Sequence, residues 1–505
     1  MPVSTRLCPE CGGPLWAADK NYRTVTTLDG LVRLGVQVRR CRDRQCPRFR
    51  VPLRSEQEGR LVLPQHEFGL DVIATIGRLR HAEHRSLPEI HAELARRGVA
   101  ICVRSVGSLL DRYDELLARS LSDAGRLRRI TAEAGRVILA IDGLPPDVGH
   151  EVLWVLRDVL SGAILLARSL LSSGQDDLAE LIGEAKDALD VSIAGVISDG
   201  QHSIRKAVAK ALPGVPHQLC HFHDLREAAR PIDEADRHAQ VLLKKKGRGG
   251  PEAEATRRSC AAVRSALTDD GRPPLETPGL KLEGRLSAIA GSRDRVARKK
   301  GLPRELTRLR AILAKGLEAT AASWPEVRAA SDWVRRAASA LANEAGLDAT
   351  GVRSVYRGLV AEMTRDARST GSLREAIGHF LKVTRSYWPG RFACYDAAEL
   401  PRTNNDLEQL FGSYRSHERR ARGRKVASPG TVVRGSVRLV ASAATRLRSV
   451  VMTGLAPSDR TAWWSLRRTL EGRQAVRTLG RRFRRDPAAY LKSVEETLIK
   501  GILPP

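Results

Sequence analysis

Apolar and polar positions follow two different periods along this chain, and the shorter period dominates residues 136–220. Short apolar runs rich in β-branched residues alternate there with turn residues, which is the pattern of buried strands. Longer stretches between some of these runs have the period of amphipathic helices. We therefore expect a three-strand meander followed by alternating helices and strands. The strands are expected at 136–142, 151–158, 163–170, 193–198 and 216–220, and the helices at 176–189 and 202–212.

Upstream of this region the pattern predicts three helices, over residues 68–79, 87–96 and 103–117. Ser86 is a suitable N-cap for the second helix, and Gly98 is a stop signal after it. Two helices joined by a short turn are typical of a helix-turn-helix, although a plain three-helix linker bundle has the same pattern. The third helix would carry the candidate DNA contacts Arg104, Ser105, Ser108 and Arg112.

Downstream, residues 225–385 are rich in Ala, Arg and Leu and show helical periods without a strand pattern. A loose segment at 244–251, rich in Lys and Gly, is expected to be a mobile loop. Basic residues then cluster after position 413 and again at 481–485. A solvated basic helix is the plain explanation of such a cluster, and binding of DNA is the functional one. The candidate DNA contacts of the first cluster are Arg415, Arg419, Arg420, Arg422, Arg424 and Lys425.

Two close cysteine pairs lie near the start of the chain. Cys8 and Cys11 form the first pair, Cys41 and Cys46 form the second, and a strand-like stretch at 32–40 separates them. Four thiolates presented by two turns can bind one zinc ion in a tetrahedral arrangement. Unrelated reduced cysteines are the alternative, but these pairs hold four of the eight cysteines in the chain. We therefore expect a zinc ribbon with a structural Zn²⁺, whose neighbouring arginines also contact phosphates.

The charge balance indicates the kind of partner. The chain has 505 residues, enough for several domains, with 85 Lys and Arg against 58 Asp and Glu and a formal net charge of +27. This excess favours double-stranded DNA as the partner, and a codon bias towards arginine is the alternative. The longest apolar stretch, 163–171, is interrupted by Arg168, so we expect no membrane span. The expected location is the cytoplasm, in association with the nucleoid.

Three carboxylates are spaced as a metal site requires. Asp142 and Asp199 each end an expected strand and are followed by Gly, and Glu408 lies in a helix-like segment. Ordinary turn residues are the alternative reading of the two aspartates. Asp406 competes with Glu408, because only one of two acids so close on a helix faces a given site. Two strand-end aspartates and a helical glutamate can hold a pair of Mg²⁺ or Mn²⁺ ions for phosphodiester chemistry.

Four motifs together resemble those of a known family. They are Ile141-Asp142-Gly143, Ser198-Asp199-Gly200, Gln218-Leu219-Cys220-His221-Phe222-His223 and Asn404-Asn405-Asp406-Leu407-Glu408. With the strand order of an RNase H-like domain and a zinc ribbon, the chain resembles the DDE transposases of bacterial insertion sequences, particularly the Mutator-like group. The resemblance implies that Asp142, Asp199 and Glu408 hold the catalytic Mg²⁺ or Mn²⁺. It also implies catalytic roles for Cys220 and His223, for which a buried cysteine and a structural histidine are the alternative.

The expected fold is a multi-domain α/β plus all-α architecture, in which a helical insertion interrupts an RNase H-like core. The expected domains are a zinc ribbon (1–66), a helix-turn-helix (67–130), the first part of the core (131–230), an all-helical insertion (231–395), the glutamate helix of the core (396–430) and a basic helical C-terminal region (431–505). The resemblance implies a transposase that binds element ends, cleaves DNA and joins the 3′ ends to target DNA, as at least a dimer. A domesticated DNA-binding regulator and a nuclease without strand transfer are the alternatives.

Overall fold

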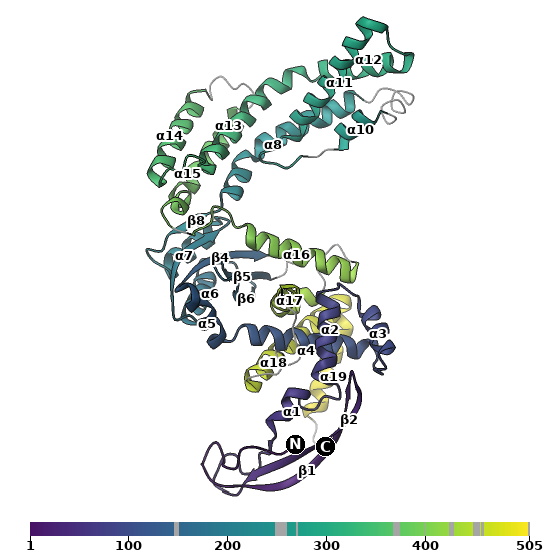
Figure 1. Cartoon of the computed structure of the whole chain (residues 1–505), viewed down its shortest axis with the longest axis vertical. Helices are drawn as coiled ribbons and strands as arrows, with labels where there is room; N and C mark the ends of the chain where they lie inside the picture. The colour runs from purple at the N-terminus through teal and green to yellow at the C-terminus, as the bar shows by residue number, and fades with distance from the viewer. Residues whose placement is uncertain are drawn as a thin grey trace. The chain divides into compact units, whose positions relative to one another are not determined.

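The computed structural model of the chain is a mixed α/β structure that divides into two compact units (Figure 1). Unit 1 contains residues 1–137, 141–192 and 405–505, and unit 2 contains residues 138–140 and 193–404. Every helix among the described residues is too short or too polar to span a bilayer. The described residues are 1–145, 151–247, 260–268, 271–366, 374–397, 399–423, 429–447, 455 and 459–502.

A long antiparallel ribbon begins unit 1. Its strands are β1 (Leu15–Thr27), β2 (Gly30–Cys41) and the short β3 (Leu53–Arg54), in the order β1-β2-β3. Gly30, with a φ of +112°, supplies the left-handed backbone of the tight turn between β1 and β2. One face of the ribbon is buried in a small core of Val25, Leu34, Val36 and Val62. The strand expected at 32–40 is therefore confirmed as part of β2.

The three helices expected after the ribbon are confirmed. They are α2 (Leu70–His81), α3 (Leu87–Arg96) and α4 (Val103–Leu121), and α1 (Glu56–Leu61) and α5 (Ala124–Ala134) flank them. Ser86 caps α3 in a reciprocal capping box with Glu89, as its sequence position indicates. Helices α2 and α4 pack so closely that a Cβ added to Gly77 would lie 2.3 Å from the ring of Tyr113.

All five strands and both helices expected between residues 136 and 220 are confirmed, with small shifts at their ends. The strands follow the sheet order β6-β5-β4-β7-β8, with β5 and β6 antiparallel and β7 and β8 parallel. Residues 137–141 of β4 are at most 1% exposed, as a strand in the middle of a covered sheet requires. The elements are β4 (Arg136–Leu144), β5 (Val152–Asp158), β6 (Ile164–Leu170), α6 (Gln175–Asp187), β7 (Ser192–Ser198), α7 (His202–Ala211) and β8 (His217–Leu219).

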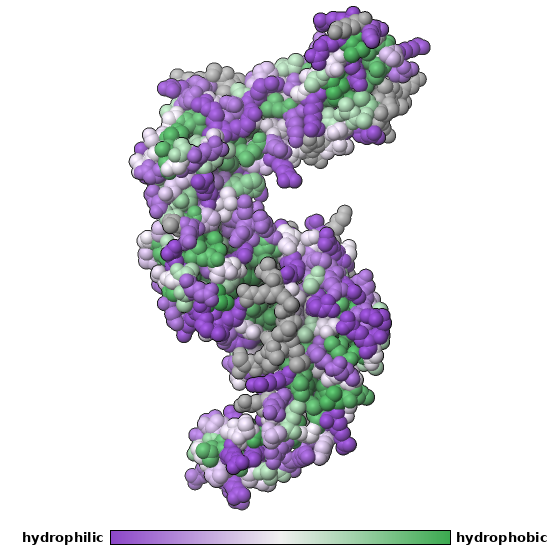
Figure 2. Space-filling view, viewed as in Figure 1, coloured by the Kyte–Doolittle hydropathy of each residue, from purple (hydrophilic) through white to green (hydrophobic). Residues whose placement is uncertain are grey.

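The rest of unit 2 is helical within the described residues, as expected. Trp333, Tyr356 and Phe380 lie in its main core, and hydrophilic residues cover much of its visible surface (Figure 2). The expectation of a loose loop at 244–246 is wrong, because these lysines form the last turn of α8; residues 248–251 lie outside the described chain. The helices are α8 (His221–Lys246), α10 (Ala261–Thr268), α11 (Pro278–Lys300), α12 (Arg304–Glu318), α13 (Trp324–Ala342), α14 (Ala349–Asp366) and α15 (Arg374–Tyr387), with 3₁₀ turns η1 (Ala321–Ser323), η3 (Trp388–Gly390) and η4 (Ala393–Tyr395).

Within the described residues, four α-helices complete unit 1. They are α16 (Asn405–Arg422), α17 (Pro429–Leu447), α18 (Arg460–Arg485) and α19 (Pro487–Ile502). Ala441 of α17 and Trp463 of α18 lie in the same hydrophobic core as the apolar faces of α2, α3 and α4. The three N-terminal helices therefore depend on C-terminal helices for their burial.

Candidate metal centre and candidate active site

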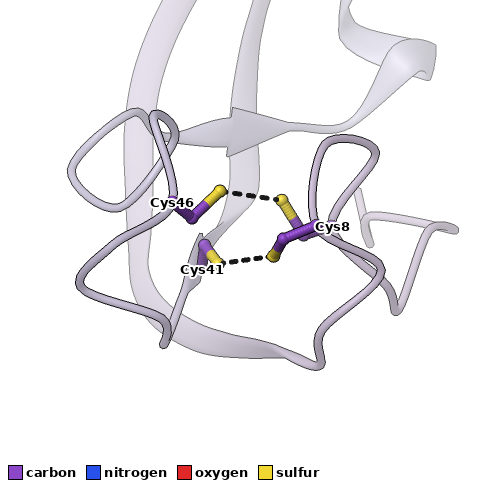
Figure 3. A group of neighbouring side chains, drawn as sticks. Cys8, Cys41 and Cys46 are labelled. Carbon is purple, nitrogen blue, oxygen red and sulfur yellow. Dashed lines mark hydrogen bonds between the residues drawn. The ribbon is translucent and has the colours of Figure 1, made fainter.

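Four cysteine sulfurs come together beside the ribbon, as the sequence predicts (Figure 3). The Sγ atoms of Cys8, Cys11, Cys41 and Cys46 all lie within 4.8 Å of one another. Cys8 and Cys46 are 3.8 Å apart, and Cys11 and Cys41 are 3.5 Å apart. Four sulfurs bound at about 2.3 Å from one tetrahedral metal lie roughly 3.8 Å from one another. The cluster is therefore compatible with a structural zinc site.

The local backbone prepares these thiols for a cation. Cys8 and Cys11 flank a turn, and Cys41 is the last residue of β2. The backbone N–H groups of Cys11 and Glu10 lower the pKa of Cys8 to about 7, so this thiol ionises near neutral pH. Burial raises the pKa of Cys41 to about 12. A bound cation would offset that cost, because metal binding releases the thiol protons.

Asp142 lies near the end of β4, where it is half-buried. Its Oδ1 accepts a hydrogen bond from the N–H of Gly143 at 2.7 Å. A Cβ added to Gly143 would lie 2.9 Å from Cγ1 of Val152 at the start of β5. The glycine after the aspartate is therefore needed for close approach of this strand end to its neighbour.

Asp199 follows β7 directly and is held by packed neighbours in unit 2. Its Oδ1 accepts a hydrogen bond from the N–H of Gln201 at 2.9 Å, and its carbonyl oxygen accepts one from the Tyr387 hydroxyl at 2.9 Å. Gly200 has a φ of +85°, and a Cβ there would lie 2.7 Å from the Tyr387 ring. The guanidinium of Arg205 lies 4.5 Å from the centre of the same ring. These contacts fix the backbone that presents the carboxylate.

The two acids that compete at the start of α16 differ in exposure. The carboxylate of Asp406 is 54% exposed and lies 3.5 Å from Nη1 of Arg157, which also donates to the Asp406 carbonyl at 3.2 Å. Glu408 is half-buried in the same first turn. The charge of Asp406 is thus partly neutralised, and the assignment of Glu408 as the metal ligand stays a prediction. Asp142 and Glu408 belong to unit 1 and Asp199 to unit 2, so their joint metal site stays a prediction.

Cys220 is a buried residue at the start of α8. It precedes α8 as its N-cap residue and is 0% exposed. Its Sγ accepts a hydrogen bond from the backbone N–H of Asn404 at 3.3 Å, directly before the helix that carries Glu408. Complete burial agrees with the alternative of a structural cysteine that holds Asn404, and the expected catalytic role of Cys220 stays a prediction. His223 is half-buried in the first turn of α8, and its expected role stays a prediction.

A buried ion pair beside this motif was not expected from the sequence. Arg391 donates to both carboxylate oxygens of Asp224 at 2.7 Å, and the guanidinium lies 4.5 Å from the centre of the Tyr356 ring. Burial raises the pKa of Asp224 to about 6, opposed by the charge of Arg391, so the carboxylate is ionised at neutral pH. His221 also hydrogen bonds through Nε2 to the Arg391 carbonyl at 2.7 Å. The pair therefore fixes the start of α8.

The candidate DNA contacts on α4 divide into two groups. Arg104 and Ser108 are exposed and Ser105 is half-buried, so these side chains remain candidates. Arg112 is a correction, because its guanidinium is 9% exposed and lies 2.6 Å from the carboxylate of Glu115. A buried, paired guanidinium is unavailable to DNA phosphates, and Arg112 instead helps join helices.

The candidates on α16 also differ in exposure. Arg415, Arg419 and Arg420 are exposed. Arg422 is half-buried, and its Nε lies 2.9 Å from the Glu418 carboxylate, so its expected contact with DNA stays a prediction. The exposed arginines remain candidates for phosphate binding. Two further candidates, Arg424 and Lys425, lie outside the described residues.

Buried charges join α4 to the C-terminal helices of unit 1. Glu115 of α4 is 0% exposed and accepts hydrogen bonds from Arg434 at 2.5 Å and from the Trp463 indole N–H at 3.2 Å. Asp114, also 0% exposed, lies 2.7 Å from Nε2 of His81 on α2. The sequence gives one signal for this network, since these acids lie on the otherwise apolar face of α4. Arg434 and Trp463, the partners of Glu115, are more than 300 positions away and could not be identified from the sequence.

The described residues thus provide a zinc-compatible cysteine cluster, three acids suited to divalent cations and exposed arginines on α4 and α16. Oxygen ligands of this kind are those that Mg²⁺ and Mn²⁺ prefer. The chain matches no protein-family model and no curated protein. A function must therefore be inferred from these residues and their positions.

Proposed function

We propose that this protein is a DDE transposase, which binds the ends of a DNA element, cleaves there and joins the 3′ ends to target DNA. One observation carries the proposal: Asp142 lies near the end of β4 and Asp199 directly follows β7, and these two strands are neighbours in the sheet order. Carboxylates at the ends of adjacent strands are a common basis for a divalent-metal site.

The order of elements supports an RNase H-like core. Three strands, β4 to β6, are followed by alternating helices and strands, then by a long helical stretch and the helix that carries Glu408. The antiparallel pairing of β5 with β6 and the parallel pairing of β7 with β8 agree with such a core. On this proposal the helices of unit 2 are an insertion before the last catalytic residue.

The side chains divide the chemical work. Asp142, Asp199 and Glu408 would hold Mg²⁺ or Mn²⁺, and the chemistry supplied at these residues would be Lewis-acid activation of a water or 3′-hydroxyl and stabilisation of a leaving 3′-oxygen. Arg415 and Arg419, exposed and one turn apart on α16, would bind the phosphates beside the cleaved bond. The zinc cluster would stabilise the N-terminal ribbon, and the exposed residues of α4 would contact the element end.

The two alternative functions predict different activities on DNA. A domesticated regulator would bind the same DNA without cleaving it, and a nuclease of the same fold would cleave it without joining. The three acids disfavour the first rival, because a regulator has no need of metal ligands. Nothing among the described residues favours the nuclease over the transposase.

The test is a strand-transfer assay with the zinc-loaded full-length protein. The substrates are labelled duplexes copied from the DNA that flanks the gene, with supercoiled plasmid as target and Mg²⁺ or Mn²⁺ as the metal. The proposal predicts cleavage at defined ends and covalent joining of the label to the plasmid. Cleavage without joining would favour the nuclease, and binding without cleavage in either metal would favour the regulator.

A further inference from the structure

The outer face of the N-terminal ribbon is cationic and carries an exposed aromatic ring. Directly opposed residues of an antiparallel pair project to the same side, so the register of β1 and β2 defines this face. The opposite face holds the buried residues Val25, Leu34 and Val36. We call the six residues of the first face the ribbon patch. They are Lys20, Tyr22 and Thr24 on β1 and, opposite them, Gln37, Gly35 and Arg33 on β2.

Tyr22 is the centre of the ribbon patch. Its side chain is 56% exposed, and a Cβ added to the opposing Gly35 would lie 3.1 Å from its Cε1 atom. The glycine therefore leaves room for the ring to lie across the ribbon. Nζ of Lys20 lies 5.5 Å from the ring centre and the guanidinium carbon of Arg33 lies 5.0 Å from it. Neither cation has a carboxylate partner within the described part of the chain.

This arrangement suits a polyanion better than a protein partner. Two unpaired cations attract phosphates, and the ribbon patch contains no acid that would repel them. An aromatic ring, an amide and a threonine hydroxyl add the contacts that proteins use on sugars and base edges. A two-stranded antiparallel ribbon also fits the major groove, which is about 12 Å wide. β1 has 13 residues and spans roughly 40 Å at about 3.4 Å per residue, so it can follow the groove.

We propose that the ribbon patch is a binding surface for duplex DNA, separate from the contacts on α4 and α16. Lys20 and Arg33 bind phosphates on the two sides of the groove, while Tyr22 and Gln37 face the sugars and base edges. The zinc cluster at the end of β2 holds the ribbon in shape. The choice of DNA as ligand rests on the proposed function, but the surface does not depend on catalysis.

The first experiment measures binding of the zinc-loaded full-length protein to a labelled, mixed-sequence duplex by fluorescence anisotropy over a range of salt concentrations. Each phosphate contact contributes about 0.9 to the slope of log affinity against log salt, so Lys20→Gln/Arg33→Gln should reduce the slope by up to about 2. At low salt, the loss should be about tenfold or more. The matched control, Arg304→Gln/Lys315→Gln on α12, removes the same charge from exposed positions and should change the slope little.

A second pair of variants tests the ring without changing the charge. Tyr22→Ser removes it, and Gly35→Ala places a methyl group against it at a position whose φ is not in the left-handed region. Both should weaken duplex binding several-fold with an unchanged salt slope and an unchanged zinc content. Thr27→Ala, at the end of β1 outside the ribbon patch, is the control.

Wild-type affinity and slope in the double variant would overturn the proposal, as would loss of binding equal to that of the α12 control. If the ribbon-patch variants keep duplex binding but lose binding to a labelled single strand in the same assay, the proposal would also be overturned, because the patch would then bind single-stranded DNA. Weakened binding in a protein that never cleaves flanking DNA would support the ribbon patch while the transposase proposal fails. If the protein cleaves flanking DNA and the ribbon-patch variants bind duplex DNA like the wild type, the transposase proposal would be supported and the ribbon-patch proposal would fail.

Discussion

Replacing Arg391 by Met should destabilise unit 2 strongly at neutral pH. In the wild type, Nε and Nη2 of Arg391 donate to the two Asp224 oxygens at 2.7 Å, and both side chains are 1% exposed. Met keeps much of the volume but removes the charge and both donors. Removal of one partner from a buried ion pair leaves an uncompensated charge and costs about 3–5 kcal/mol.

The loss of stability caused by Arg391→Met should become smaller as the pH falls. Burial raises the pKa of Asp224 to about 6 even with Arg391 present, and the variant loses the opposing positive charge, so the folded-state pKa rises further. The unfolded carboxyl titrates near about 3.9, so between these values the folded variant binds more protons than the unfolded chain. Protonation therefore stabilises the folded variant. Its penalty relative to the wild type should fall by up to about 1.4 kcal/mol per pH unit between about pH 7 and pH 6, and then stay level, because the wild-type Asp224 also binds a proton below about pH 6.

Urea unfolding followed by circular dichroism at about pH 7 and about pH 6 measures the penalty of Arg391→Met. The control is Arg336→Met in the same unit, which removes a guanidinium 2.6 Å from Glu362 in a pair whose side chains are 43% and 39% exposed. An exposed pair of this kind is worth less than about 1 kcal/mol at either pH. An Arg391→Met protein that unfolds at the wild-type urea concentration, or with the same penalty at both pH values, would refute the reasoning.

Three further predictions follow from single sites. Cys8→Ser should release zinc, measured by metal analysis, and weaken DNA binding; a purified reduced wild type without zinc would remove the metal assignment. Burial lowers the pKa of His221 to about 4, below its unfolded value of about 6.5, so the wild type loses stability as the pH falls between these two values. In urea titrations, His221→Gln should reduce this loss by about 1.4 kcal/mol per pH unit. Gly77→Ala should cost about 1–3 kcal/mol because its Cβ would lie 2.3 Å from Tyr113, whereas Gly183→Ala, with open space around it, should stabilise α6 by up to about 1 kcal/mol; equal thermal shifts would contradict this.

Local patterns predicted most of the elements. Strands β4 to β8, helices α2 to α4 and the capping box at Ser86 could be expected because apolar period, glycine position and cap residues act within a few neighbouring residues. The cysteine cluster could be predicted for a similar reason, since two spaced pairs are a strong signal for one metal. The continuation of α8 through Lys246 could not, because polar lysines fit both a helix end and a loop.

Long-range pairing could not be predicted. Arg112 has the sequence position of a DNA-reading residue, but its burial depends on Glu115 and on helices hundreds of residues away. Likewise, Asp224 and Arg391 are separated by 167 positions, and nothing in either local pattern indicates the other. Charge alone does not separate a surface arginine from a buried one, since both kinds have polar neighbours along the chain. The sequence therefore predicts which acids are candidates for the metal site, but not which cations are free to bind DNA.

The most direct test of the central claim is strand transfer by three charge-removing variants, Asp142→Asn, Asp199→Asn and Glu408→Gln, each compared with the wild type on flanking DNA in Mg²⁺ and Mn²⁺. Asp406→Asn is the matched control, because its carboxylate lies beside Arg157. We expect each of the three variants to lose at least about 10³-fold in cleavage and joining while retaining duplex binding, and we expect near wild-type activity for the control. Wild-type joining by any of the three variants, or loss of activity in Asp406→Asn instead of Glu408→Gln, would contradict it.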